Sequence, residues 1–132
     1  MERIFLMETV LLYQIKGTKT AALLKPVLLK LGIRVRIVEP EQYLQSIGFL
    51  AGNKAFAESP EAYDGAGFDE PMMVMAGFSE RKLDLFLTEM HRKKVPPIAL
   101  KAIVTTQNQA WNSLQLYREL KEEHEKMKSY RK

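Results

Sequence analysis

Short apolar runs alternate with stretches of helical spacing along the chain. Residues 9–15, "TVLLYQI", and residues 71–78, "PMMVMAGF", are continuously apolar and short, as strands buried on both faces are. Residues 33–39, "IRVRIVE", alternate apolar side chains with two arginines, and residues 98–105, "IALKAIVT", form a further apolar run. The pattern therefore predicts four strands over these ranges.

Helical spacing follows the first and third strands. An apolar stripe between residues 24 and 31 ends at Gly32, a common helix stop. Pro26 leaves two interpretations open: a helix kinked by an internal proline, or a shorter helix from about Lys25 with the proline in its first turn. The next helix is predicted to begin after Ser79, which can cap it, and to end before Pro96.

The last helix is predicted to run from about Thr106 or Asn108 towards Ser129. Two caps compete at its start: Thr106 with Gln109 in a capping box, or Asn108 alone. Either cap would explain structurally why polar residues crowd the stretch "TTQN". Residues 40–52 predict a short helix and a turn, and residues 53–70 predict a long loop, because they show no clean period.

The fourfold order of strand and helix predicts an α/β fold. We expect three layers, α/β/α, around a four-stranded parallel sheet, similar to flavodoxin-like or Rossmann-like folds. The strand order should be 2-1-3-4, since Arg34 and Arg36 share one face of the second strand and suit a sheet edge. No internal repeat is visible in the amino-acid letters.

Residues 1–132 are predicted to form a single domain. Met7 is an alternative start, so residues 1–6 are a candidate extension. Residues 121–132 are expected to project as a helix end, because the apolar stripe thins after Leu120 to Met127 and Tyr130.

Composition and charge narrow the class of protein. There are no cysteines, the start lacks the layout of a signal peptide, and no apolar run is long enough to span a membrane. We therefore expect a cytoplasmic protein that does not enter the membrane. The net charge is +4, but residues 16–38 carry six bases and no acid, and residues 58–70 carry five acids and no base. Two solvated surfaces of opposite sign are the simpler interpretation; a basic face for phosphate or nucleic acid is the alternative.

A ligand site is predicted from the expected parallel sheet. In such sheets ligands bind beyond the carboxyl ends of the strands, at the point where the strand order reverses. This edge would carry hydroxyls, amides and two lysines, but no acid, histidine or cysteine. The candidate ligand-binding residues are Gln14, Lys16, Gly17, Thr18, Lys19, Thr20, Gly77, Ser79, Thr105, Thr106 and Asn108.

Catalytic and cofactor motifs are missing from the sequence. "KGTKT" lacks the second glycine of a phosphate-binding loop, and no GxGxxG follows the first strand. His91 and His124 lie on different predicted helices, so neither a catalytic residue nor a metal site nor a cofactor is predicted. Trp111 is predicted to be a core residue rather than a stacking platform for a ligand.

The second half of the chain is similar to a bacterial family. "PMMVMAGFSERKLDLFLTEMH" and "IALKAIVTTQNQAWNSLQLYRELKEEHE" resemble the family called domain of unknown function 3783, over about residues 71–125. The similarity rests on "GFS" before one helix and on "LKAIVT", the tryptophan and "ELKEEHE" around the other. It implies a bacterial origin, but it brings no activity, cofactor or catalytic residue.

Three functions are predicted, in this order. The first is a non-catalytic ligand-binding, protein-binding or regulatory module, in which the projecting last helix packs on a protein partner or a second copy. The second is an enzyme acting on a phosphorylated or anionic small molecule through Lys16, Lys19 and the nearby threonines. The third is weak nucleic-acid binding through the basic stretch, which the modest net charge argues against.

Overall fold

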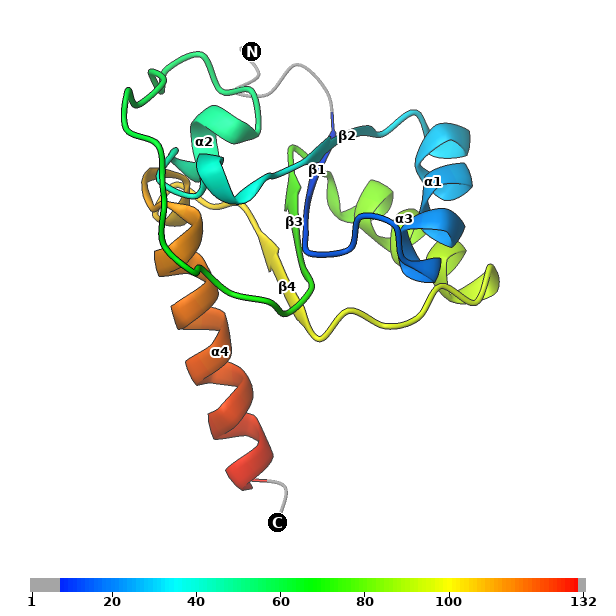
Figure 1. Ribbon diagram of the computed structural model, residues 1–132. Helices are drawn as coiled ribbons and strands as arrows, with labels where there is room; N and C mark the ends of the chain where they lie inside the picture. Colours follow the sequence, from blue (N-terminus) through cyan, green and yellow to red (C-terminus); the bar gives the residue numbers. More distant parts are fainter. Residues whose placement is uncertain (1–7, 131–132) are drawn as a thin grey trace.

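The computed structural model describes residues 8–130 and contains one four-stranded sheet (Figure 1). Strands β1 (Thr9–Tyr13), β2 (Arg34–Ile37), β3 (Met72–Ala76) and β4 (Leu100–Ile103) lie in the order β2-β1-β3-β4. The predicted strand order is therefore confirmed, with β2 at an edge. The candidate extension, residues 1–6, lies outside the described residues.

The prediction of a wholly parallel sheet is wrong. β2 runs parallel to β1 and β4 parallel to β3, but β1 and β3 are antiparallel, with Leu11 opposite Val74 at the centre. A strand buried on both faces is a continuous apolar run in either direction, so the hydrophobic pattern could not reveal this. Because the central pair is antiparallel, the sheet is mixed and the fold is neither flavodoxin-like nor Rossmann-like.

Helices cover both faces of the sheet, as predicted for three layers (Figure 1). α1 (Lys19–Leu31) and α3 (Glu80–Arg92) pack on one face. The short α2 (Ile47–Leu50) and the long α4 (Ser113–Tyr130) pack on the other, preceded by the 3-10 turns η1 (Pro40–Gln42) and η2 (Asn108–Ala110). The far end of α4 extends beyond the sheet (Figure 1).

Successive side chains of β1 enter two separate cores. Val10 and Leu12 pack with α1 and α3, whereas Leu11 and Tyr13 pack with α2 and α4. All four are at most 3% exposed, which explains why these four positions are apolar or aromatic. Alternation with a period of two thus divides one apolar run between two cores.

The chain contains two similar strand–helix–strand units related by an approximate twofold axis perpendicular to the sheet. Each unit has a 13-residue helix on the same sheet face. Gln14 and Gly77 take positive φ values of 59° and 79° directly after the central strands. Thr18 and Ser79 then cap the two helices, accepting bonds from Ala21 N–H and Lys82 N–H.

The correspondence continues at the ends of the two helices. Gly32 and Lys94 both have positive φ values, 68° and 59°. The next residue in each unit, Ile33 or Val95, is buried and donates its N–H to a carbonyl five residues back. Such a left-handed residue satisfies the last carbonyls of a helix.

The segments after the edge strands also correspond. Ser46 and Asn112 face each other in an antiparallel bridge, and each caps the helix that follows it. The internal repeat is thus structural. The repeat cannot be recognised in the amino-acid sequence because different residues play the same role in the two units. A helix cap can be Thr, Ser or Asn, and a residue with left-handed backbone can be Gly, Gln or Lys.

The sequence left the boundaries of two helices open, and the structure defines them. α1 runs through Pro26, whose exposed position leaves the carbonyl of Ala22 open to water. The last helix does not begin at Thr106 or Asn108, because the chain extends at Trp111, with φ −78° and ψ 157°, after the short turn η2. Asn112 Oδ1 accepts the N–H of Gln115 at 2.9 Å, so Asn112 is the cap that begins α4.

The repeat predicts a stabilising substitution. Lys94→Gly should raise the free energy of unfolding by roughly 0.5–1 kcal/mol, because glycine removes the left-handed backbone strain of a residue with a Cβ, less the entropy glycine adds to the unfolded chain. Urea denaturation measures the change. Gly32→Ala should lower stability by about 1 kcal/mol, although nothing lies within 4 Å of the added methyl group. Equal effects at both positions would contradict this account.

Candidate functional site

The predicted site residues lie beyond opposite ends of the strands. We call these two ends of the sheet the first edge and the second edge, as distinct from the edge strands β2 and β4. Because β1 and β3 are antiparallel, Tyr13 at the end of β1 pairs with Met72 at the start of β3. The first edge carries Gln14, Lys16, Gly17, Thr18, Lys19 and Thr20. The second carries Gly77, Ser79, Thr105, Thr106 and Asn108. The structure therefore does not bring these residues together into one site.

At the first edge, several polar groups already have partners within the chain. Gln14 Nε2 donates to the hydroxyl of Tyr43 at 2.8 Å. Thr18 Oγ1 accepts the N–H of Ala21 and donates to the carbonyl of Ile15. Lys16 Nζ lies 3.5 Å from a carboxylate oxygen of Glu39, an acid that weakens the positive field of this edge. Their role in ligand binding stays a prediction.

At the second edge, Thr105 and Asn108 bond each other in a reciprocal pair. Asn108 Oδ1 accepts the N–H of Thr105 at 2.8 Å, and Thr105 Oγ1 accepts the N–H of Asn108 at 3.0 Å. Asn108 Nδ2 also donates to the carbonyl of Ile103. The first unit has the same arrangement between Glu39 and Gln42. This part of the polar cluster holds the turn after the edge strand, one place earlier than the capping box we predicted.

Stacked aromatic rings hold the last part of the long loop, residues 53–70, against the rest of the protein. Phe68 is stacked between Tyr43 and Tyr117, with ring centroids 4.7 Å and 4.2 Å away and planes within 5° of parallel. The loop backbone passes close to these rings, since a Cβ at Gly67 would lie 2.8 Å from Tyr43 Cε2. The loop predicted over residues 53–70 is thus irregular, and its last part is packed against the rest of the protein.

Glu70 ends this loop and binds α4. Its Oε1 accepts bonds from Tyr117 Oη at 2.6 Å and Lys121 Nζ at 2.7 Å. These bonds, that of Lys121 foremost, lower the pKa of Glu70. The same carboxylate raises the pKa of Tyr117 and of Lys121 by favouring their protonated forms. The start of α4 is therefore held to the long loop by both stacking and charge.

Beyond this attachment, one face of α4 is uncovered. An open groove of about 550 Å³ runs along it, and its lining residues recur every three or four positions, as on one side of a helix. We call this set the exposed α4 stripe. It consists of Leu114, Tyr117, Arg118, Lys121, Glu122, Glu125 and Lys126.

Three of the charged side chains of the exposed α4 stripe have no partner among the described residues of the chain. Among the residues that the structure describes, Arg118, Glu122 and Lys126 make no hydrogen bond or ion pair. Glu125 has only a 3.7 Å contact with Lys121, which already binds Glu70. A second cleft on the other side of α4 is lined by residues that include Leu120, His124 and Met127, the last 53% exposed. Free space therefore flanks the projecting half of this helix.

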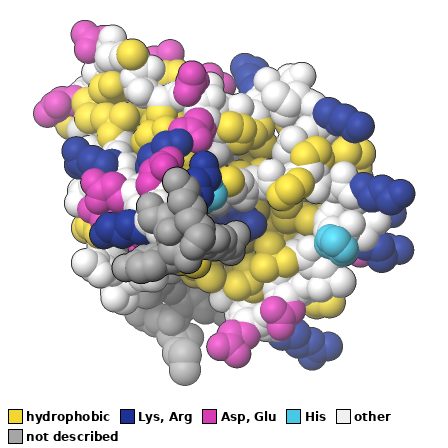
Figure 2. Space-filling view, turned by 90° about the horizontal axis from the view of Figure 1, so that it is seen from below, with side chains coloured by type: hydrophobic (Ala, Val, Ile, Leu, Met, Phe, Trp, Pro, Cys, Tyr) yellow, Lys and Arg dark blue, Asp and Glu magenta, His cyan; other side chains and the backbone are white. Residues whose placement is uncertain are grey.

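Charge is unevenly distributed over the rest of the surface. Figure 2 views the molecule from the end toward which α4 projects, and Lys and Arg side chains crowd its right margin, the side of α1 and α3. Acidic side chains gather at its upper left. Within residues 8–130, no group of His, Asp and Glu side chains is placed to hold a metal, and no helix has the length and apolar character needed to cross a bilayer.

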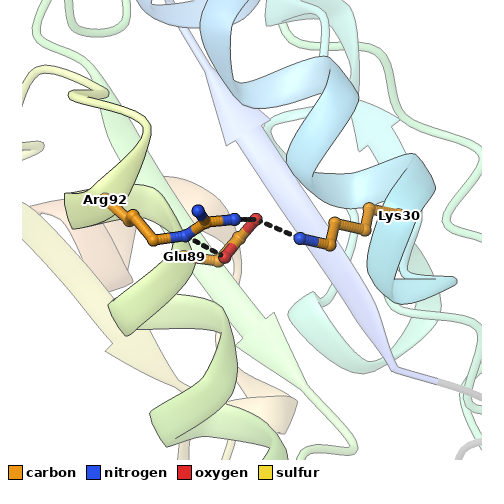
Figure 3. A network of polar contacts seen from close by, with 3 residues as sticks. All are labelled: Lys30, Glu89 and Arg92. Carbon is orange, nitrogen blue, oxygen red and sulfur yellow. Dashed lines mark hydrogen bonds and ion pairs between the residues drawn. The ribbon is translucent and has the colours of Figure 1, made fainter.

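The strongest ionic cluster joins α1 to α3 (Figure 3). Glu89 lies between the two helices, with its side chain 11% exposed, and contacts Lys30 Nζ at 2.7 Å and Arg92 Nη2 at 3.0 Å. The bonds from Arg92 and then Lys30 lower the pKa of Glu89 from 4.5 to about 2. Every group in the cluster is paired within it, so this cluster is a structural link between helices. Nothing in the helical pattern distinguished Glu89 from a solvated acid.

These observations define a class: an α/β protein of two packed strand–helix–strand units, with an open groove along one face of α4. Residues 71–127 match the model of the family described as Domain of unknown function (DUF3783), so the resemblance predicted for this segment is confirmed. The match covers β3, α3, β4 and most of α4, which is the second unit with its long helix. Searches of curated proteins and of solved structures found no match.

Asn108 offers a test of the structural role of the polar cluster. Asn108→Ala should lower the free energy of unfolding by about 2–3 kcal/mol, because it leaves the N–H of Thr105 and the carbonyl of Ile103 without their partner. Thermal and urea denaturation measure this loss. Thr106→Ala, at an exposed neighbour, is the control and should cost less than about 0.5 kcal/mol. A loss as small as the control's would show that the pair is dispensable.

Glu89 predicts a pH dependence of stability. In the folded protein Glu89 stays ionised down to a pKa of about 2, but in the unfolded chain it takes up a proton near 4.5. Its stabilising effect is therefore complete above about pH 4.5 and is lost as the pH falls towards 2. Urea midpoints at about pH 5 and about pH 3 should differ more for the wild type than for Glu89→Gln. Parallel losses in both proteins would exclude this role.

Proposed function

We propose that the protein is a non-catalytic protein-binding module whose contact surface is the exposed α4 stripe. The observation that carries this proposal is a helix that projects from the body with an open groove along it and unpaired charges on its face. A charged side chain fixed on a rigid helix, but without an internal partner, is free to bind one on another molecule.

The packing of α4 supports this function. Tyr117 and Lys121 are anchored by Phe68 and Glu70, so the groove has one wall held in place before a partner arrives. A surface that needs little ordering on binding retains more of its interaction free energy. In the cell, we place this module in the cytoplasm of a bacterium, in keeping with its cysteine-free composition and its family resemblance.

Two alternatives are weaker. An enzyme or receptor for an anionic small molecule would rely on Lys16, Lys19 and Thr18, but the mixed sheet separates this group from the polar residues of the other edge. Weak nucleic-acid binding would use the basic side of the molecule in Figure 2. A groove of about 440 Å³ does lie on α3, but Glu80 and Asp84 line it together with Arg81, so it has no basic character that would favour nucleic acid.

Site-specific crosslinking tests the proposed surface. We expect a photoreactive benzoylphenylalanine in place of Arg118 to give a crosslinked species of higher mass in cells that produce the protein. The same residue in place of Arg81, which is exposed on α3, should not. Crosslinks of equal yield at both positions, or none at 118, would contradict the proposal. The mass of the product identifies the partner as a second copy or as another protein.

A further inference from the structure

The order of charges on the exposed α4 stripe points to its partner. We infer that the stripe binds the same stripe of a second copy, with the two α4 helices antiparallel about a twofold axis centred between Lys121 and Glu122. This inference rests on the proposed function, because it names the partner of the surface proposed above. A twofold contact of this kind is isologous, so each favourable pair occurs twice.

Opposite charges meet along the helix in this register. Arg118 of one copy lies level with Glu125 of the other, and Lys121 lies level with Glu122. On the flanks, Glu119 comes level with His124, and no like charges meet from 118 to 126. The register thus makes partners of Arg118 and Glu122, which have none among the described residues of their own chain.

The apolar groups also fit this arrangement. Tyr117 comes level with Lys126, whose aliphatic stem and ammonium group can lie against an aromatic ring. The end of one α4 would therefore occupy the groove beside Tyr117 of the other copy.

Other pairings of the same helices bring like charges together. A shift of one turn in one direction sets Lys121 level with Lys126 and Glu122 with Glu125. A shift of one turn in the other direction sets Arg118 level with Lys121. In a parallel pair each residue would face its own copy. A shift of three residues, which sets Arg118 level with Glu122, is the exception, but it leaves Glu125 level with Gln115. The centred antiparallel register therefore pairs more opposite charges of the stripe than these alternatives do.

The seam between the helices is mostly charged, which sets the strength of the contact. Exposed ion pairs each contribute little and are screened by salt. The dimer should therefore be weak, concentration-dependent and sensitive to ionic strength. Such behaviour suits reversible association rather than a permanent dimer.

A charge swap tests the register. Sedimentation equilibrium of the full chain at low salt should show a monomer–dimer equilibrium at concentrations up to the order of 1 mM. Arg118→Glu alone and Glu125→Arg alone should each weaken the dimer by roughly tenfold or more, since each replaces two attractions with two repulsions. The double variant Arg118→Glu/Glu125→Arg should restore dimerisation to within about threefold of the wild type.

The controls separate this inference from the proposed function. Arg81→Glu makes the same charge reversal on α3 and should leave the dimer unchanged. A monomeric wild type, or single variants that dimerise as well as the wild type, would overturn the inference. If residue 118 still crosslinks to a protein of different mass, the binding function stands and only the second copy is excluded. Circular dichroism confirms that each variant is folded.

Discussion

The antiparallel pairing of β1 with β3 determines the rest of the structure. Leu11 and Val74 meet at its centre, both fully buried, and each contributes about 1.5–3 kcal/mol of apolar burial. Because this pair sets the second unit against the first in the opposite direction, it sends the turns after β1 and after β3 to opposite edges. It also places α1 and α3 on one face and leaves the other to α2, the long loop and α4.

The sequence predicted the positions of the strands and helices better than it predicted the directions of the strands. Strand order and the edge position of β2 followed from Arg34 and Arg36, whose side chains do not suit a central strand. The direction of β3 had no such signal, because Met72 to Ala76 would be equally apolar in either orientation. The candidate site depended on that direction, so its two halves were wrongly placed together. Asn112 was missed as the cap of α4 because polar residues at 105–108 offered competing caps.

The sequence indicates some features of the proposed contact surface on α4 but not others. The thinning apolar stripe after Leu120 is the sequence feature on which a projecting end was predicted, and Figure 1 shows the far end of α4 beyond the sheet. The anchoring of its base could not be foreseen, because Phe68 and Glu70 come from a loop with no periodic pattern. Long-range contacts between an irregular segment and a helix depend on the three-dimensional path of the chain. Sequence spacing alone does not report that path.

The edge of β3 that faces the approximate twofold axis is the one that pairs with β1. In the whole chain β1 pairs with that edge, and its residues, 9–13, lie outside the segment 71–127 that matches the family model. A polypeptide limited to the family segment would expose a bare row of backbone amides and carbonyls along Met72–Ala76. Such a polypeptide would need a strand from another source to pair with this edge. In this protein β1, from the first unit of the same chain, is that strand.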